Sequence, residues 1–99
     1  MTSLDSLLST DFSPHVGQPF PLKVGETELV LSLHEVKVLG HRRAEASRDP
    51  FSLEFHGPAG VRLSQGTYAL QHPTLGSLEV FITQIGLSAG NSSFEAIFT

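Results

Sequence analysis

Residues 67–83 alternate apolar and polar side chains in two runs that flank a short break. A period of two is typical of a strand that buries one face. The break, His72–Gly76, contains Pro73 and Gly76, whose fixed and permissive φ angles both suit a turn. The stretch therefore predicts a β-hairpin at the centre of a small β domain. The alternating apolar positions are Tyr68, Leu70, Leu78, Val80 and Ile82.

The predicted hairpin offers an inner face on which neighbouring strands can pack. Residues 51–55 and 94–98 each place large apolar side chains at every second position. Phe81 points to the opposite face of its strand, which suggests that this strand is covered on both sides. The expected core consists of Tyr68, Leu70, Val80 and Ile82, packed by Phe51, Phe55, Phe94 and Phe98.

Two strands are expected before the hairpin, and each carries an irregularity. Gln18–Val24 contains Pro19 and Pro21, which cannot donate to a ladder, so it is expected to be an edge strand at best. In Thr27–Leu39 the apolar positions change parity midway. Either a β-bulge near His34–Glu35 returns them to one face, or the strand passes from one packing surface to another. We favour the bulge, because one inserted residue keeps both apolar sets inside.

A short helix, turns and a brief strand account for the remaining segments. Ser3–Phe12 has helical apolar spacing, and a second short turn ends at Gly17. Residues 61–63 indicate a brief strand, and Gly86–Ser93 indicates a loop. We therefore expect a mainly β fold, a small antiparallel sandwich, roll or barrel of about six to seven strands with a short N-terminal helix. The helix would present Leu4, Leu7, Leu8 and Phe12.

Composition narrows the class of protein. The 99 residues are 39% hydrophobic, which is enough for one core, so we expect a single domain over residues 1–99. A net charge of −4 disfavours attraction to nucleic acid and to anionic membranes. Cysteine is absent from the sequence, which excludes disulfides and thiolate metal sites. With no signal-peptide pattern and no apolar run that could span a bilayer, the expected location is the cytoplasm.

Gly86–Gly90 matches the Gly-x-Ser-x-Gly pattern of a hydrolase nucleophile elbow. An elbow needs a helix after the turn and a histidine further downstream. No histidine follows Ser88, and the next stretch alternates as a strand does. We therefore expect a glycine-rich hairpin loop, no catalytic residue and no enzyme activity.

Five histidines raise the question of a metal site. None forms a His-x-His pair or a helical His-x-x-x-His pair. His34 and His56 can meet across neighbouring strands, which provides two ligands at most. We expect no metal site and no cofactor, and we assign the histidines surface or hydrogen-bonding roles. They are His15, His34, His41, His56 and His72.

The longest polar stretch, residues 40–50, holds three of the six basic residues. Arginine can make bidentate contacts to carboxylate or phosphate groups, so this loop can hold an acidic segment of a partner. Two nearby carboxylates dilute its positive charge. Two interpretations stay open, a solvated loop and a partner-binding loop. The residues concerned are Arg42, Arg43 and Arg48.

Several motifs along the chain occur together in one known family. They are Asp11-Phe12, Val16-Gly17-x-x-Phe20, Pro50-Phe-Ser-Leu-x-Phe55-x-Gly-Pro58, Gln65-Gly-x-Tyr-x-Leu-x-His-Pro-x-Leu-Gly76 and Phe94-Glu-Ala-x-Phe98. On these motifs nearly the whole chain resembles a bacterial family of about this length that is catalogued as a domain of unknown function. The block that ends at Gly76 is the most specific. The chain departs from its relatives at Ser88–Ser93, which lacks their acidic residue, so no calcium-like role is carried over.

The resemblance implies an accessory role beside tail-collar proteins related to phage tails, and it assigns no catalytic residues. Together with the composition, it favours a non-catalytic structural or protein-interaction module. The alternative is a small enzyme or ligand-binding β-barrel with a His-lined pocket. We expect a protein partner rather than nucleic acid or a membrane, and a homo-oligomer is compatible with the sequence.

Overall fold

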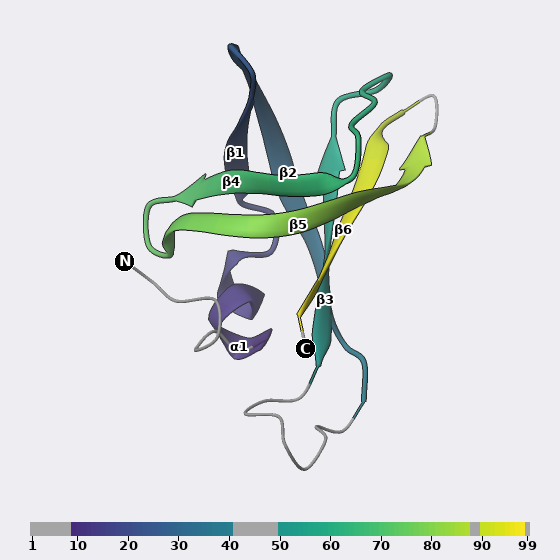
Figure 1. Ribbon diagram of the computed structural model, residues 1–99. Coiled ribbons are helices and arrows are strands. Elements are labelled where there is room, and N and C mark those ends of the chain that lie inside the picture. Colours follow the sequence, from purple (N-terminus) through teal and green to yellow (C-terminus); the bar gives the residue numbers. More distant parts are fainter. Residues whose placement is uncertain (1–8, 41–49, 88–89, 99) are drawn as a thin grey trace.

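Strands form where apolar and polar side chains alternate, and they close into an antiparallel barrel (Figure 1). The computed structural model describes residues 9–40, 50–87 and 90–98, and these contain six strands. Around the barrel the order is β1-β2-β3-β6-β5-β4. The mainly β fold is confirmed, and the barrel is the arrangement that forms. The strands are β1 (Pro19–Val24), β2 (Thr27–Val38), β3 (Phe51–Gly57), β4 (Gly66–His72), β5 (Gly76–Leu87) and β6 (Ser92–Phe98).

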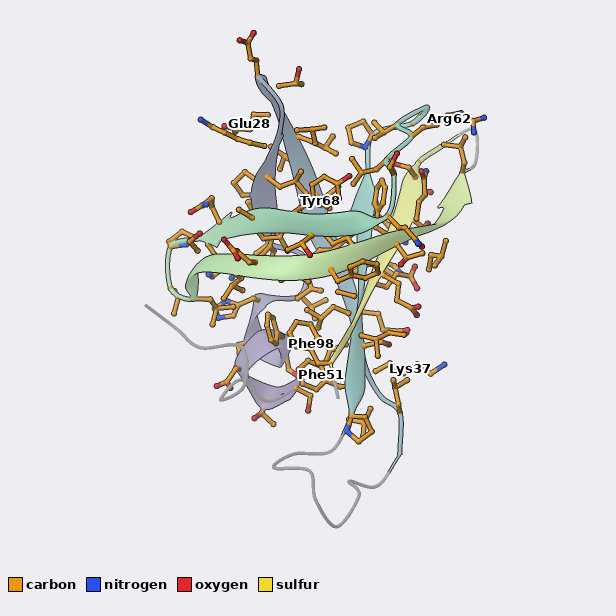
Figure 2. All side chains as sticks on the ribbon, viewed as in Figure 1. Glu28, Lys37, Phe51, Arg62, Tyr68 and Phe98 are labelled. Atoms are coloured by element: carbon orange, nitrogen blue, oxygen red, sulfur yellow. The ribbon has the colours of Figure 1, made fainter. Side chains whose placement is uncertain are left out.

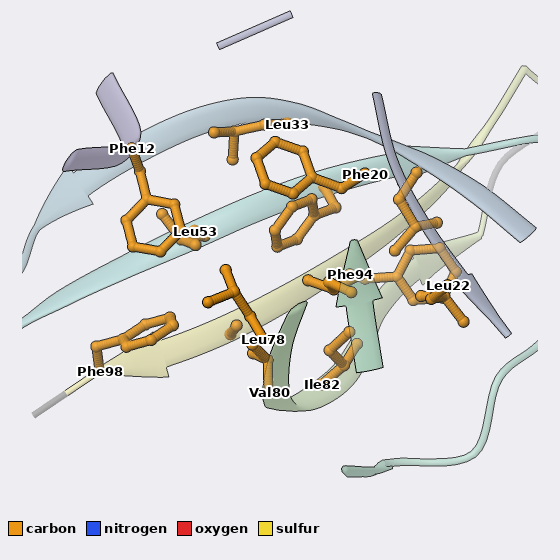
Figure 3. Close-up of a cluster of buried hydrophobic side chains, with 14 of the residues drawn as sticks. Phe12, Phe20, Leu22, Leu33, Leu53, Leu78, Val80, Ile82, Phe94 and Phe98 are labelled. Atoms are coloured by element: carbon orange, nitrogen blue, oxygen red, sulfur yellow. The ribbon is translucent and has the colours of Figure 1, made fainter. Parts of the chain in front are cut away.

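Phenylalanine and leucine side chains from all six strands fill the barrel (Figure 3). The expected hairpin register is present, because Tyr68 pairs with Val80 and Leu70 with Leu78. Tyr68 is only partly buried, and its hydroxyl donates to the Ser64 carbonyl at 2.6 Å. The other seven expected core residues are buried, as predicted: Phe51, Phe55, Leu70, Val80, Ile82, Phe94 and Phe98.

The predicted bulge in β2 is confirmed. Leu33 pairs with Phe55 on β3, but the next pair joins Glu35 to Glu54, so His34 is the inserted residue. The insertion returns Val36 to the inner face, where it packs against the core. Val38 remains 55% exposed, because it pairs with the first residue of β3 at the end of the barrel.

The expectation for the first strand is wrong, since β1 has a partner on each side. It pairs with β2 along its length and with β4 through Leu22 and Leu70. Pro19 and Pro21 lack backbone N–H groups, which limits hydrogen bonding at this seam. The barrel closes there through the Leu22–Leu70 pair, and the side chains of Phe20 and Leu22 are both buried beneath it.

Two local expectations in the second half of the chain are also corrected. Residues 61–64 form no strand, because the Gln84 side chain satisfies their backbone: it accepts from Leu63 N–H at 2.9 Å and donates to the Val61 carbonyl at 2.8 Å. The expected loop from Gly86 to Ser93 is shorter, because β5 continues to Leu87 and β6 begins at Ser92. A bulge between Gln84 and Gly86 keeps the two strands paired.

A short helical segment precedes the barrel and covers part of its core. It consists of α1 (Ser9–Phe12) and a 3-10 turn, η2 (Ser13–His15). Phe12 is buried, with its ring 5.8 Å from that of Phe51 and 5.6 Å from that of Phe98, and Figure 2 shows the latter two side chains beside α1. The expected contacts of Leu4, Leu7 and Leu8 lie outside the described residues. Within the described part of the chain, no helix is long and apolar enough to cross a membrane.

The turn between β4 and β5 is organised by His72. Its Nδ1 accepts backbone N–H groups from Thr74 at 3.1 Å and Leu75 at 3.2 Å. Because backbone N–H groups only donate, the ring proton must sit on Nε2, which donates to Gln18 Oε1 at 2.8 Å. The ring also stacks on Phe20, with 4.7 Å between centroids. Its neutral form is therefore required by the turn.

Burial lowers the pKa of His72 below its ordinary value of 6.5, and the neighbouring charge of His15 lowers it further. In the folded state the proton is thus taken up at a lower pH than in the unfolded chain. Stability conferred by neutral His72 is full above pH 6.5 and is lost progressively as the pH falls toward the lowered pKa.

We predict that His72→Asn reduces this acid sensitivity. Asparagine can accept from the same turn N–H groups but does not titrate. Between neutral and mildly acidic pH, the free energy of unfolding should fall more steeply for the wild type than for His72→Asn. The difference in slope is up to about 1.4 kcal/mol per pH unit for one proton. Urea melts across this range measure the difference; identical slopes for both proteins would show that His72 does not carry the effect.

Candidate functional site

Three side chains with metal-ligand chemistry meet on the outside of the barrel. Glu54 and His56 are two residues apart on β3, so both project from its outer face. The bulge residue His34 on β2 projects beside them, next to Ser32, which pairs with His56. One donor atom from each of His34, Glu54 and His56 lies within 4.8 Å of the other two. We call these three residues the His–Glu cluster.

The cluster is held by a stacking contact and two hydrogen bonds. The rings of His34 and His56 stack at 3.9 Å between centroids, with 16° between their planes. Asn91 Nδ2, from the segment before β6, donates to His56 Nδ1 at 3.1 Å. His56 Nε2 therefore carries the ring proton and donates to Glu54 Oε2 at 2.7 Å. Glu54 and His56 are partly buried and His34 is exposed, so the cluster is open to solvent.

The limit of two ligands expected from the sequence is wrong, because Glu54 completes a set of three. The proximity of His34 and His56 was anticipated, whereas the carboxylate was missed. The signal was present in Glu54-Phe-His56: in a strand, this spacing puts both polar side chains on one face. Spacing rules taken from helices and loops do not detect such a pair.

A row of carboxylates crosses the same outer wall. Glu35 on β2 pairs with Glu54 on β3, and Glu54 pairs with Glu95 on β6. Like charges directly opposite one another in a sheet are destabilising. Strands β3, β4, β5 and β6 contain neither lysine nor arginine, so none of these four strands offsets the charge of Glu54 and Glu95 with a lysine or arginine.

Large apolar side chains lie exposed beside the acidic row. Phe81 and Ile85 on β5 are 55% and 49% exposed, and Ile97 on β6 is 58% exposed. The expectation that the second hairpin strand is covered on both sides is therefore wrong, because β5 buries only its inner face. Phe81 and Ile97 each lie two residues beyond the Thr83–Glu95 pair, on the same side of it. We call Phe81, Ile85 and Ile97 the β5–β6 patch.

A shallow groove lies where β1 meets β4, across the barrel from β3 and β6. It has a volume of about 480 Å³, and its lining includes Pro19, Pro21 and Pro73 together with Val30 and Glu28. His72 reaches this groove, while its partner His15 lies at 4.3 Å between ring centroids. The described histidines thus form two separate pairs, one at each wall, rather than one set lining the barrel interior.

Other residues singled out from the sequence are placed only in part. Arg42, Arg43 and Arg48 lie outside the described residues, as do His41 and Ser88. The Gly-x-Ser-x-Gly segment runs from the end of β5 toward the start of β6, so a strand follows it, as predicted. This is a hairpin setting and not the strand-to-helix turn of a nucleophile elbow.

The fold and the site together define a class of protein, a closed six-stranded antiparallel barrel with polar and apolar clusters on its outer wall. Within that class the chain belongs to the family described as "Domain of unknown function (DUF6916)", which matches residues 7–98. No curated protein and no solved structure matches the chain.

Proposed function

We propose that this protein is a non-catalytic protein-interaction module that binds its partner through the β5–β6 patch. The observation that carries the proposal is the exposure of Phe81, Ile85 and Ile97 on a barrel whose core is otherwise well filled. Phe81 and Ile97, exposed at matching positions of neighbouring strands, lose contact with water when a partner covers them, and aromatic side chains are enriched in interface cores.

The rigidity of the patch supports the proposal. Phe81 is flanked along β5 by Val80 and Ile82, both buried, and Ile97 is flanked along β6 by Ala96 and Phe98. The packed core therefore holds the backbone of both strands in place. Presenting apolar side chains on a fixed surface reduces the conformational entropy lost on binding.

The charges around the patch define the chemistry of the partner. Glu79 lies two residues from Phe81 on β5, and Glu95 lies two residues from Ile97 on β6. Each carboxylate therefore shares the outer face of its strand with the apolar side chain. β4, β5 and β6 contain no lysine or arginine to neutralise them. A complementary surface combines apolar side chains with arginine or lysine. The proposed partner is thus a protein with a basic rim around an apolar centre.

The family resemblance supports a setting for this interaction. We propose an accessory role in a bacterial phage-tail-like assembly, in the cytoplasm. Assemblies of this kind are built from protein–protein contacts, which suits a small module without a catalytic site. Arg42, Arg43 and Arg48 stay proposed as a second contact, for an acidic segment of a partner.

We predict that Phe81→Ser combined with Ile97→Ser strongly reduces partner capture in the native cell. Removing two central apolar contacts should weaken association by about tenfold or more. Because both side chains are exposed, the free energy of unfolding should change by no more than about 0.5 kcal/mol per site. Tagged wild type and variant are expressed at equal levels, cross-linked in the cell and compared by quantitative mass spectrometry.

Val30→Ser is the matched control, since Val30 is 45% exposed but lines the groove at β1. It should capture the partner as the wild type does. Loss of capture in the control alone would assign the interface to the groove and overturn the proposal. Turnover in a general ester-hydrolase screen that disappears in Ser88→Ala would contradict its non-catalytic part.

A further inference from the structure

We propose that His34, Glu54 and His56 bind a divalent transition-metal ion of the zinc type, with one coordination position left to solvent. Two imidazole nitrogens and one carboxylate oxygen form a donor set that zinc accepts in proteins. The inference rests on the His–Glu cluster alone and does not depend on the proposed interaction through the β5–β6 patch. It departs from the expectation drawn from the sequence, which counted two ligands.

The distances allow one ion to reach all three side chains. Ligand atoms bonded at about 2.0–2.2 Å to a tetrahedral ion lie roughly 3.3–3.6 Å from one another. The donor atoms of the cluster already lie within 4.8 Å, and the His56–Glu54 pair is at 2.7 Å. Side-chain rotation alone can supply the remaining adjustment, because His34 is exposed and Glu54 and His56 are only partly buried.

Asn91 is placed to orient the central ligand. A histidine that binds a metal through Nε2 carries its proton on Nδ1, where a second group usually accepts it. The Asn91 amide lies 3.1 Å from His56 Nδ1, and rotation of this amide presents its oxygen in place of its nitrogen. The same side chain can thus support the apo tautomer and the metal-binding tautomer.

The carboxylate row supplies an electrostatic reason for a cation at this point. Glu35, Glu54 and Glu95 occupy directly opposed positions on three neighbouring strands. A dication at Glu54 offsets the repulsion that these pairs would otherwise add to the folded state. A simple His56–Glu54 ion pair would also offset part of it, but such a pair needs no contribution from His34.

Calorimetric titration of the full chain with zinc chloride tests the proposal. We expect one zinc ion per chain, and binding weakened about tenfold or more by His34→Ala and by Glu54→Gln. Asn91→Ala should weaken it to a smaller extent. Cobalt titration provides a second readout, because a site with four ligands gives intense visible absorption that His34→Ala should remove.

His15→Ala is the matched control, since it removes a histidine from the other pair. It should leave zinc binding unchanged. The absence of a binding heat in the wild type would overturn the proposal. So would binding that persists in His34→Ala and Glu54→Gln, since the ion would then sit elsewhere on the chain. Circular dichroism of each variant establishes that the barrel is intact in every comparison.

Discussion

Phe55→Ala is expected to unfold the protein or nearly so. Phe55 is fully buried on β3, between paired Leu33 on β2 and Phe94 on β6. Its ring meets Phe20 edge-on at 5.6 Å, and Phe20 belongs to the strand that closes the barrel. Truncating a buried phenylalanine costs about 3–5 kcal/mol, a large share of the roughly 5–15 kcal/mol that stabilises a domain.

Urea denaturation followed by circular dichroism measures the effect. Ile97→Ala is the control, because Ile97 is 58% exposed and its truncation should change the free energy of unfolding by no more than about 0.5 kcal/mol. If Phe55→Ala lowers the free energy of unfolding by less than about 1 kcal/mol, the barrel must collapse around the cavity left by the ring. The core would then be less well packed than the burial of Phe55 indicates.

Phe98→Ala is expected to have the second largest effect, about 3 kcal/mol, because it opens one end of the barrel. The Phe98 ring stacks on Phe51 at 4.8 Å with 3° between planes, and it lies 5.6 Å from Phe12 of α1. Phe98 is 5% exposed, so the expected loss in the free energy of unfolding lies at the lower end of the range for phenylalanine truncation. Loss of Phe98 should also release α1 from the barrel.

A double-mutant cycle separates these contributions. If Phe98 acts through the ring cluster, Phe12→Ala should cost less in the Phe98→Ala background than in the wild type, with a coupling of about 0.5–3 kcal/mol. Denaturant melts of the two single variants and the double variant provide the comparison. Additive losses, or a mild effect of Phe98→Ala alone, would show that the end of β6 is peripheral to the core.

Alternation along the sequence was enough to predict most of the inner surface of the barrel. The change of parity in Thr27–Leu39 also located the bulge at His34. Strand order and closure depend on contacts between distant residues, and periodicity contains no information about them. Pro19 and Pro21 suggested a free edge because proline weakens a ladder, yet β1 pairs with β4 at Leu22 and Leu70, and both of these side chains are buried.

The same limit explains the other errors. Residues 61–63 alternate as a strand does, but the side chain of Gln84 takes the hydrogen bonds that a neighbouring strand would supply. Because Phe81 is apolar, it was expected to be buried beneath another element. Whether a side chain on the outer face of a strand is buried depends on the elements that pack over it, and the alternation along the strand does not specify these. Glu54 was overlooked because it lies two residues from His56 on one strand, a spacing that helix and loop rules do not include, and because His34 joins the pair only across the sheet.

Site-specific photo-crosslinking in the native cell tests whether the β5–β6 patch binds a partner. Two variants of the protein are compared. A photoreactive phenylalanine analogue replaces Phe81 in the first and Val30 in the second, since these positions lie on opposite walls of the barrel. We expect an adduct from position 81, attached to a partner peptide that contains arginine or lysine, and none from position 30. An adduct from position 30 alone, equal adducts from both, or none from position 81 would contradict this expectation.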